Sequence, residues 1–249
     1  MRISPRRHST DVEEMRTQDA VTIGAGVAGF ALCVYILTYM TTRHEPVAWQ
    51  NGDLVFQTST SLPNEMILSA SASPLTNVGI VAVSEENGAT VISTGPSQVD
   101  EVSIGSFVSR GSDGAIAVYR VLNMTPELGV QVVTAARKQI GKPYDTFFDK
   151  SADSIYAAEL VRLAYSEIGV TLGTTTRLET LAKGQPGFEA VYDQQWSNLQ
   201  ACHSRNLDQE HCWAYVLKQQ IIMPASIAAD EHVAMIYTDM PSVQALRPE

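Results

Sequence analysis

The sequence has few cations and no basic cluster interleaved with aromatic residues after residue 43. Its 17 Lys and Arg residues are outnumbered by 27 Asp and Glu residues, which gives a formal net charge of −10. A surface of that sign repels phosphate backbones, so nucleic acid is excluded as a general partner. The sequence also has no CxxC pair among its three cysteines, which argues against a standard structural zinc site.

The chain does contain enough apolar material for a packed core. Of its 249 residues, 45% are hydrophobic and 18% are charged, a balance typical of a globular domain and not of a disordered chain. The length predicts one sizeable domain with an appendage.

Charged residues are absent from residues 20–42, between Asp19 and Arg43. A helix that crosses a bilayer needs about 20 apolar residues, so residues 20–42 are expected to form a transmembrane helix or signal anchor. Four arginines precede this segment and one closely follows it. The positive-inside rule then makes residues 1–19 a cytoplasmic tail of a single-pass protein and places the domain of residues 47–249 in the periplasm or outside the cell. A cleaved signal peptide is the alternative, although the apolar run is longer than an ordinary h-region.

The same segment contains a Gly-x-Gly-x-x-Gly pattern, from Gly24 to Gly29. That pattern is typical of an oxidoreductase that binds NAD or FAD. Two features argue against this function. Residues 30–40 are apolar on all sides, whereas a Rossmann helix has a solvated face. The next strand-like stretch, which ends at Gln50, also lacks the acidic residue that would bind the ribose.

Hydrophobic periodicity in the remaining chain predicts strands followed by two helices and then further strands. β-branched and apolar runs predict strands at 53–57, 78–83, 89–93, 116–122, 220–223 and 233–237. One helix is predicted from a Thr125 cap to about Ile140, and a second helix follows a candidate Ser154 cap and ends at Gly169. This order predicts an α+β fold.

Four segments of this domain resemble one known family in both order and spacing. They are Trp49–Gln57, Leu75–Val81, Gly141–Asp145 and Tyr156–Val161. They resemble the opening Gly-Asp strand, the Ser/Thr-His-x-Gly strand, the Gly-Lys-Pro-Tyr-Asp turn and the Tyr-Cys-x-Glu helix start of the YiiX/YebB-like group. That group is a circularly permuted branch of the NlpC-type papain-like cysteine hydrolases. The resemblance covers about residues 47–240 and implies a permuted papain-like fold.

The resemblance also implies an amidase or peptidase site with a Cys nucleophile, a His base and a polar third residue. In such a site the helix dipole lowers the pKa of the thiol and the imidazole accepts its proton. This chain departs from that pattern: the Cys position is Ala157, the His position is Asn77, and the third position falls near Ile92 or Ser93. An engineered Cys-to-Ala change would explain Ala157 but not Asn77. The motif residues that remain, and that would line the family's groove, are Asp53, Tyr144, Asp145, Tyr156 and Glu159.

Two of the cysteines, Cys202 and Cys212, lie close together in the sequence, each beside a histidine. Adjacent Cys-His and His-Cys doublets are an awkward spacing for one tetrahedral zinc site. In an oxidising compartment the simpler interpretation is a Cys202–Cys212 disulfide, with two unpaired thiols as the alternative, and no metal or other cofactor is expected.

These observations favour a membrane-anchored pseudoenzyme, an envelope binding or scaffold protein that holds a peptide, acyl or lipid-like ligand. The absence of a nucleophile at position 157 and of a base at position 77 is the basis of this hypothesis. An active amide or ester hydrolase that uses other residues is the alternative, and an NAD- or FAD-binding oxidoreductase is less favoured.

Overall fold

A computed structural model describes the chain over residues 47–59, 73–145, 148, 153–183, 189–190, 192–193 and 196–244. The domain comprises Ala48–Glu249. Within the described ranges, no helix has the length and apolar character needed to cross a bilayer. The predicted membrane segment, residues 20–42, and the glycine pattern within it lie outside these ranges.

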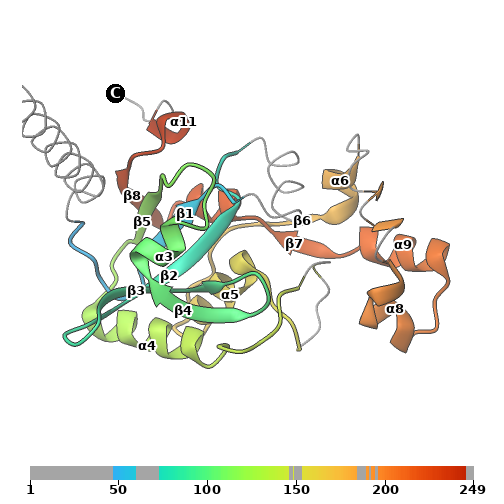
Figure 1. The fold of residues 1–249 in the computed structure, drawn as a ribbon, viewed down its shortest axis with the longest axis horizontal. Helices are drawn as coiled ribbons and strands as arrows, with labels where there is room; N and C mark the ends of the chain where they lie inside the picture. The colour runs from blue at the N-terminus through green and yellow to red at the C-terminus, as the bar shows by residue number, and fades with distance from the viewer. Residues whose placement is uncertain are drawn as a thin grey trace, which may run out of the picture. The chain divides into compact units, whose positions relative to one another are not determined.

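A six-stranded sheet with the strand order β4-β3-β2-β1-β5-β8 forms the centre of the domain (Figure 1). Every neighbouring pair in it is antiparallel. Its strands are β1 (Leu54–Gln57), β2 (Asn77–Ser84), β3 (Gly88–Thr94), β4 (Val99–Ser103), β5 (Ala117–Val121) and β8 (Val233–Thr238). The helices around it are α3 (Ile104–Val108), α4 (Pro126–Arg137), α5 (Ala157–Ser166), α10 (Pro224–Ala228) and α11 (Pro241–Gln244).

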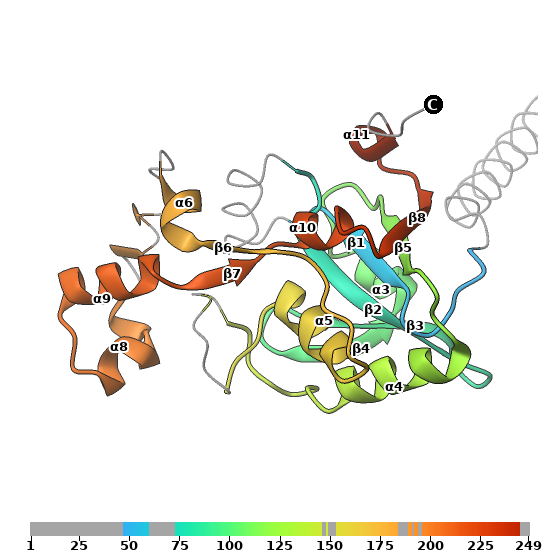
Figure 2. The same ribbon diagram turned by 180° about the vertical axis from the view of Figure 1, so that it is seen from behind.

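The two faces of the sheet are covered by different helices. Figure 1 shows α3 in front of the sheet, and Figure 2, seen from behind, shows α5 in front of it. Alternation along the strands sends Val78 and Ile80 to the face of α4 and α5, where they belong to the main core. The neighbouring residues, such as Val81, are buried outside that core, on the α3 face. Because side chains on both faces of the sheet are buried, the sequences of β1 and β2 contain continuous apolar runs and do not alternate with polar residues.

The α4 helix begins as the sequence predicted and ends earlier. The Thr125 hydroxyl accepts a hydrogen bond from the Leu128 N–H, and Pro126 occupies the first turn, where the missing proline N–H costs nothing. The regular helix stops at Arg137, and the chain turns through residues 138–140 to reach Gly141.

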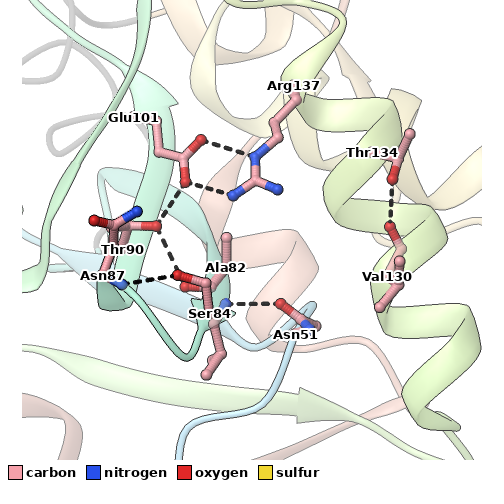
Figure 3. Close-up of polar contacts among 10 residues, drawn as sticks. Asn51, Ala82, Ser84, Asn87, Thr90, Glu101, Val130, Thr134 and Arg137 are labelled. Carbon is pink, nitrogen blue, oxygen red and sulfur yellow. Dashed lines mark hydrogen bonds and ion pairs between the residues drawn. The ribbon is translucent and has the colours of Figure 1, made fainter.

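Figure 3 shows how α4 is tied to the edge of the sheet. The Arg137 guanidinium donates two hydrogen bonds to Glu101 of β4, at 2.7 and 2.9 Å, and the Thr90 hydroxyl of β3 donates to the same carboxylate. These contacts lower the pKa of Glu101, with the Arg137 hydrogen bond as the largest cause. At the other end of α4, Gly129 lies against Asn51, where a Cβ atom would come within 2.4 Å of the Asn51 carbonyl oxygen.

A separate lobe lies beyond a two-stranded ribbon formed by β6 (Thr175–Arg177) and β7 (Gln220–Ile222). The ribbon extends away from the sheet toward this lobe (Figures 1 and 2). The lobe contains α6 (Leu178–Ala182), η1 (Trp196–Asn198), α8 (Gln200–Ser204) and α9 (Gln209–Leu217). The predicted disulfide is present: Cys202 of α8 is bonded to Cys212 of α9. Closing so short a loop contributes on the order of 3 kcal/mol.

Candidate functional site

The α5 helix begins at Ala157, one of the positions where the sequence departs from the family that it resembles. The N-cap is Tyr156, which makes no side-chain capping hydrogen bond. The predicted Ser154 cap is therefore wrong. The reason is that Ile155 still pairs with Tyr144 in a parallel bridge, so the chain remains extended until Tyr156. Ala157 is 6% exposed and offers only a methyl group at the positive end of the helix.

The Gly-Lys-Pro-Tyr-Asp turn connects the start of α5 to the edge of the sheet. Gly141 has a φ of +89°, which a residue with a Cβ rarely adopts. The Tyr144 N–H then donates to the Ser97 carbonyl at 2.9 Å, just before β4. The Asp145 N–H donates to the Ile155 carbonyl at 3.1 Å. The turn therefore fixes where the helix begins relative to the strands.

These contacts place Ala157 at the end of the sheet where β2 begins. Ser97, which accepts the hydrogen bond from the turn, precedes β4. It lies close to the last residue of β3, Thr94, because Thr94 pairs with Val99 of β4. The other end of α5 is also anchored, because the Tyr165 hydroxyl donates to the Gly52 carbonyl and the Gly52 N–H donates to Val81. The eight-residue separation from Ala157 to Tyr165 spans about 12 Å as a helix. The four-residue separation from Asn77 to Val81 spans about 13 Å as a strand. The helix start and the first residue of β2, Asn77, are therefore at the same end.

Asn77 shares an end of the sheet with Ala157, but the register of β2 directs its side chain to the α3 face. It pairs with Gln57, and Gly79 pairs with Ser93, so all four residues lie on that face. The Asn77 amide oxygen accepts a hydrogen bond from the adjacent Val78 N–H at 3.0 Å. Of the two candidates for the third position, Ser93 is on the same face as Asn77. The other candidate, Ile92, pairs with Ile80 on the α5 face.

Two buried polar side chains accompany Asn77. Gln57 and Ser93 are both fully buried, and the Gln57 amide atoms and the Ser93 hydroxyl have no hydrogen-bond partner in the described part of the chain. Buried polar atoms without partners each cost roughly 1–3 kcal/mol. Neither residue was identified as functional from the sequence, although a glutamine in an otherwise apolar buried strand was a usable signal.

Four of the predicted motif residues lie together around the start of α5. The Tyr156 hydroxyl accepts a hydrogen bond from the Ile222 N–H at 2.9 Å, which joins this helix to the β6–β7 ribbon. Burial raises the pKa of Tyr156, and the charges of Glu159 and Asp145 raise it further. Burial also raises the pKa of Tyr144, followed by the charge of Asp145. The helix start therefore lies near the charges of two carboxylates, Asp145 and Glu159, which the positive charge of Arg162 partly opposes.

Asp53, the fifth motif residue, is at the other end of β1 and has a structural role. Its carboxylate accepts hydrogen bonds from the Arg120 guanidinium at 2.7 and 2.8 Å and from the Gln50 N–H at 2.8 Å. The Asp53 side chain is fully buried, whereas that of Arg120 is 26% exposed. The structure therefore does not bring Asp53 together with the residues at the α5 start.

The described residues contain no thiol paired with an imidazole. Cys202 and Cys212 are bonded to each other, and Cys33 lies outside the described ranges. The described histidines are exposed and contact the Ser197 carbonyl, Asp208 and Asp230. Over the same ranges, no group of three or more His, Cys, Asp or Glu side chains is arranged to hold a metal ion.

Comparison with known proteins identifies the fold and the family. Residues 48–237 match the family described as permuted papain-like amidase enzyme, YaeF/YiiX, C92 family. Uncharacterized protein YiiX of Escherichia coli K12 is 26% identical over 147 residues, which are 57% of this chain and 72% of that protein. The crystal structure of metalloprotein yiiX from Escherichia coli O157:H7 superimposes with a TM-score of 0.65 at 21% identity, covering 77% of this chain and 98% of that one. The resemblance to YiiX-like permuted papain-like proteins is therefore confirmed.

Proposed function

The chain belongs to the permuted papain-like amidase family of YaeF and YiiX, and on that premise we propose that it is a member without cysteine-dependent catalysis. In this proposal the domain acts as an envelope binding or scaffold protein. The observation that carries it is Ala157 at the first position of α5, where the family motif has its cysteine.

The lost chemistry follows from the atoms at two positions. A methyl group has no lone pair with which to attack a carbonyl carbon, so no acyl-enzyme can form at position 157. The amide of Asn77 does not accept a proton near neutral pH, so it cannot replace an imidazole base. Loss of the nucleophile alone removes the covalent route, and loss of the base removes the means of activating a substitute.

Binding does not require either residue. The Gln57 carboxamide offers an NH2 donor group and a carbonyl acceptor and Ser93 offers a hydroxyl, and both are fully buried on the α3 face, at the end of the sheet where α5 begins. A peptide or acyl-amide group carries the complementary N–H and C=O, and pairing with it would relieve the cost of these atoms. This chemistry supports a peptide, acyl or lipid-like ligand at this end of the sheet, and because both side chains are fully buried, such a ligand would have to displace the residues that cover them.

The full chain is expected to hydrolyse no amide, peptide or ester substrate above the background of a heat-inactivated sample, with or without iodoacetamide. The measurement is product release from a panel of acyl-amide and peptide substrates at neutral pH. Turnover that persists after alkylation would show an active hydrolase that uses other residues. Turnover that alkylation abolishes would show a working thiol, and either result would overturn the proposal.

We also propose that residues 20–42 anchor the domain to a membrane, with the domain on the periplasmic or outer side. The support is the uncharged apolar run and the arginines before it. The full chain is expected in the membrane fraction after a high-salt wash, and a chain that starts at residue 47 is expected in the supernatant. Recovery of the full chain in the supernatant would contradict the anchor and would favour the dinucleotide-binding interpretation of Gly24–Gly29.

A further inference from the structure

The lobe beyond the β6–β7 ribbon has a small pocket, separate from the α5 start. Its volume is about 270 Å³, slightly below the usual 300–1,000 Å³ of small-molecule sites. The size suits a compact head group and not an extended chain. The lining residues described are Glu189, Tyr192, Asp193, Gln209, Glu210 and Trp213.

Two aromatic rings form one wall of the pocket. Tyr192 and Trp213 have ring centroids 4.4 Å apart and ring planes inclined by 40°. Tyr192 is 3% exposed and its hydroxyl donates to the Gln209 carbonyl at 2.5 Å, which holds the ring in place. The electron-rich faces of tyrosine and tryptophan attract cations within about 6 Å.

The polar part of the lining is negative. Glu189, Asp193 and Glu210 contribute carboxylates, and none of the six lining residues described is basic. Burial raises the pKa of Tyr192 to about 12, and the charges of Asp193 and Asp208 raise it as well. A negative, partly aromatic pocket favours a cation over a neutral or anionic ligand.

The arrangement does not suit a bare metal ion. These carboxylates do not form one of the close groups that could hold a metal, and the described residues contain no such group. A larger cation with its charge spread over alkyl groups needs no direct coordination and has an apolar surface for the rings.

The pocket wall is also fixed in place. The Cys202–Cys212 disulfide attaches α9, which carries Gln209, Glu210 and Trp213, to α8. The Gln209 amide donates to Asp193 at 2.9 Å and so joins α9 to the segment before η1. A fixed wall reduces the ordering cost of binding.

We propose that this pocket binds an alkylated ammonium group, such as the trimethylammonium of a choline-like compound, between the Tyr192–Trp213 pair and the carboxylates. The half-buried Trp213 ring, held in place by the buried Tyr192 ring behind it, contacts the methyl groups, and the carboxylates of Glu189, Asp193 and Glu210 neutralise the charge. The proposal is independent of whether the α5 start binds a ligand.

The test is calorimetric titration of the full chain with choline and with its neutral carbon isostere, 3,3-dimethyl-1-butanol. Choline is expected to bind and the isostere is not. The double variant Glu189→Gln/Glu210→Gln is expected to weaken choline binding by about tenfold, and Trp213→Leu by roughly two- to thirtyfold. Glu85→Gln/Glu86→Gln is the matched control, since it removes the same charge from an exposed turn and is expected to leave the affinity unchanged.

The ligand source is distinguished with glycerophosphocholine, a soluble copy of a lipid head group. Binding at least as tight as that of choline assigns the pocket to head groups, and binding of choline alone assigns it to free cations. The proposal is overturned if choline does not bind, if the isostere binds equally well, if calcium displaces choline, or if the control variant weakens binding as much as the pocket variant. The two charge variants keep the test decisive even if Trp213→Leu does not fold.

Discussion

The double variant Ala157→Cys/Asn77→His is expected to hydrolyse acyl-amide substrates on the order of 10²–10⁴ times faster than Ala157→Cys alone. The cysteine supplies the missing nucleophile at the first position of α5. The histidine supplies the base that lowers the cost of forming the thiolate. Both positions open their elements at the same end of the sheet. The side chain of residue 77 starts on the α3 face, so the prediction requires the longer imidazole to reach the thiol around this end of the sheet.

Ala157→Cys alone is expected to remain close to background on amides. A thiol at a helix start is helped by the helix dipole, but the charges of Asp145 and Glu159, which raise the pKa of the neighbouring Tyr156, act against it. Without an imidazole, those charges favour the protonated thiol. The single variant therefore separates the contribution of the base from that of the nucleophile.

A matched control is Ala158→Cys/Asn77→His, which carries the same two side chains one residue further along α5. Ala158 is fully buried and points about 100° away around the helix axis, so this variant is expected to show no gain. The measurement is initial rate against substrate concentration for all three variants, after circular dichroism has shown that each is folded. Equal rates for the double and single variants at position 157 would mean that residue 77 is not the base position.

The strands that the sequence predicted correctly are those whose signal is local. The β2–β3 hairpin was predicted from β-branched runs on either side of a Glu-Glu-Asn-Gly turn, and the structure pairs Ser84 with Gly88 across it. The disulfide was equally local, since Cys202 and Cys212 are ten residues apart.

The β4 strand was not predicted because its amino-acid composition is not typical of a strand. Two of its five residues are acidic, Asp100 and Glu101, and acidic residues are depleted in strands. In the structure each carboxylate pairs with an arginine outside β4: Asp100 with Arg110, in the turn after α3, and Glu101 with Arg137 of α4. Arg137 is 36 residues from Glu101, and Arg110 lies outside any helix or strand, so hydrophobic periodicity in a single sequence does not reveal that the acidic residues are compensated.

The candidate site shows the same division between local and distant signals. Motif spacing was sufficient to identify the residues around the start of α5, and Tyr144, Asp145 and Tyr156 are there. It gave no indication that Asn77 shares the α3 face with Gln57 and Ser93, because the face depends on the β1–β2–β3 register. The register is a property of the whole sheet.

Replacing Asp53 with alanine is expected to destabilise the domain by about 3 kcal/mol. The substitution leaves the Arg120 guanidinium without its carboxylate and removes the acceptor of the Gln50 N–H. It also leaves a cavity where the fully buried Asp53 side chain lies. For a domain of this size, such a loss corresponds to a decrease of roughly 6–12 °C in melting temperature.

Glu101→Ala is the control that separates the effect of burying a carboxylate from the effect of pairing it with an arginine. Glu101 and Arg137 make the same two-bond contact as Asp53 and Arg120, but their side chains are 22% and 48% exposed. Solvent screens an exposed pair and rehydrates the partner that remains, so this change is expected to cost at most about 1 kcal/mol. Thermal unfolding of both variants, followed by near-ultraviolet circular dichroism, makes the comparison. Equal decreases in the free energy of unfolding would show that Asp53 owes its effect to the ion pair alone. A threefold larger decrease for Asp53→Ala would show that the burial of the carboxylate decides how much this aspartate stabilises β1.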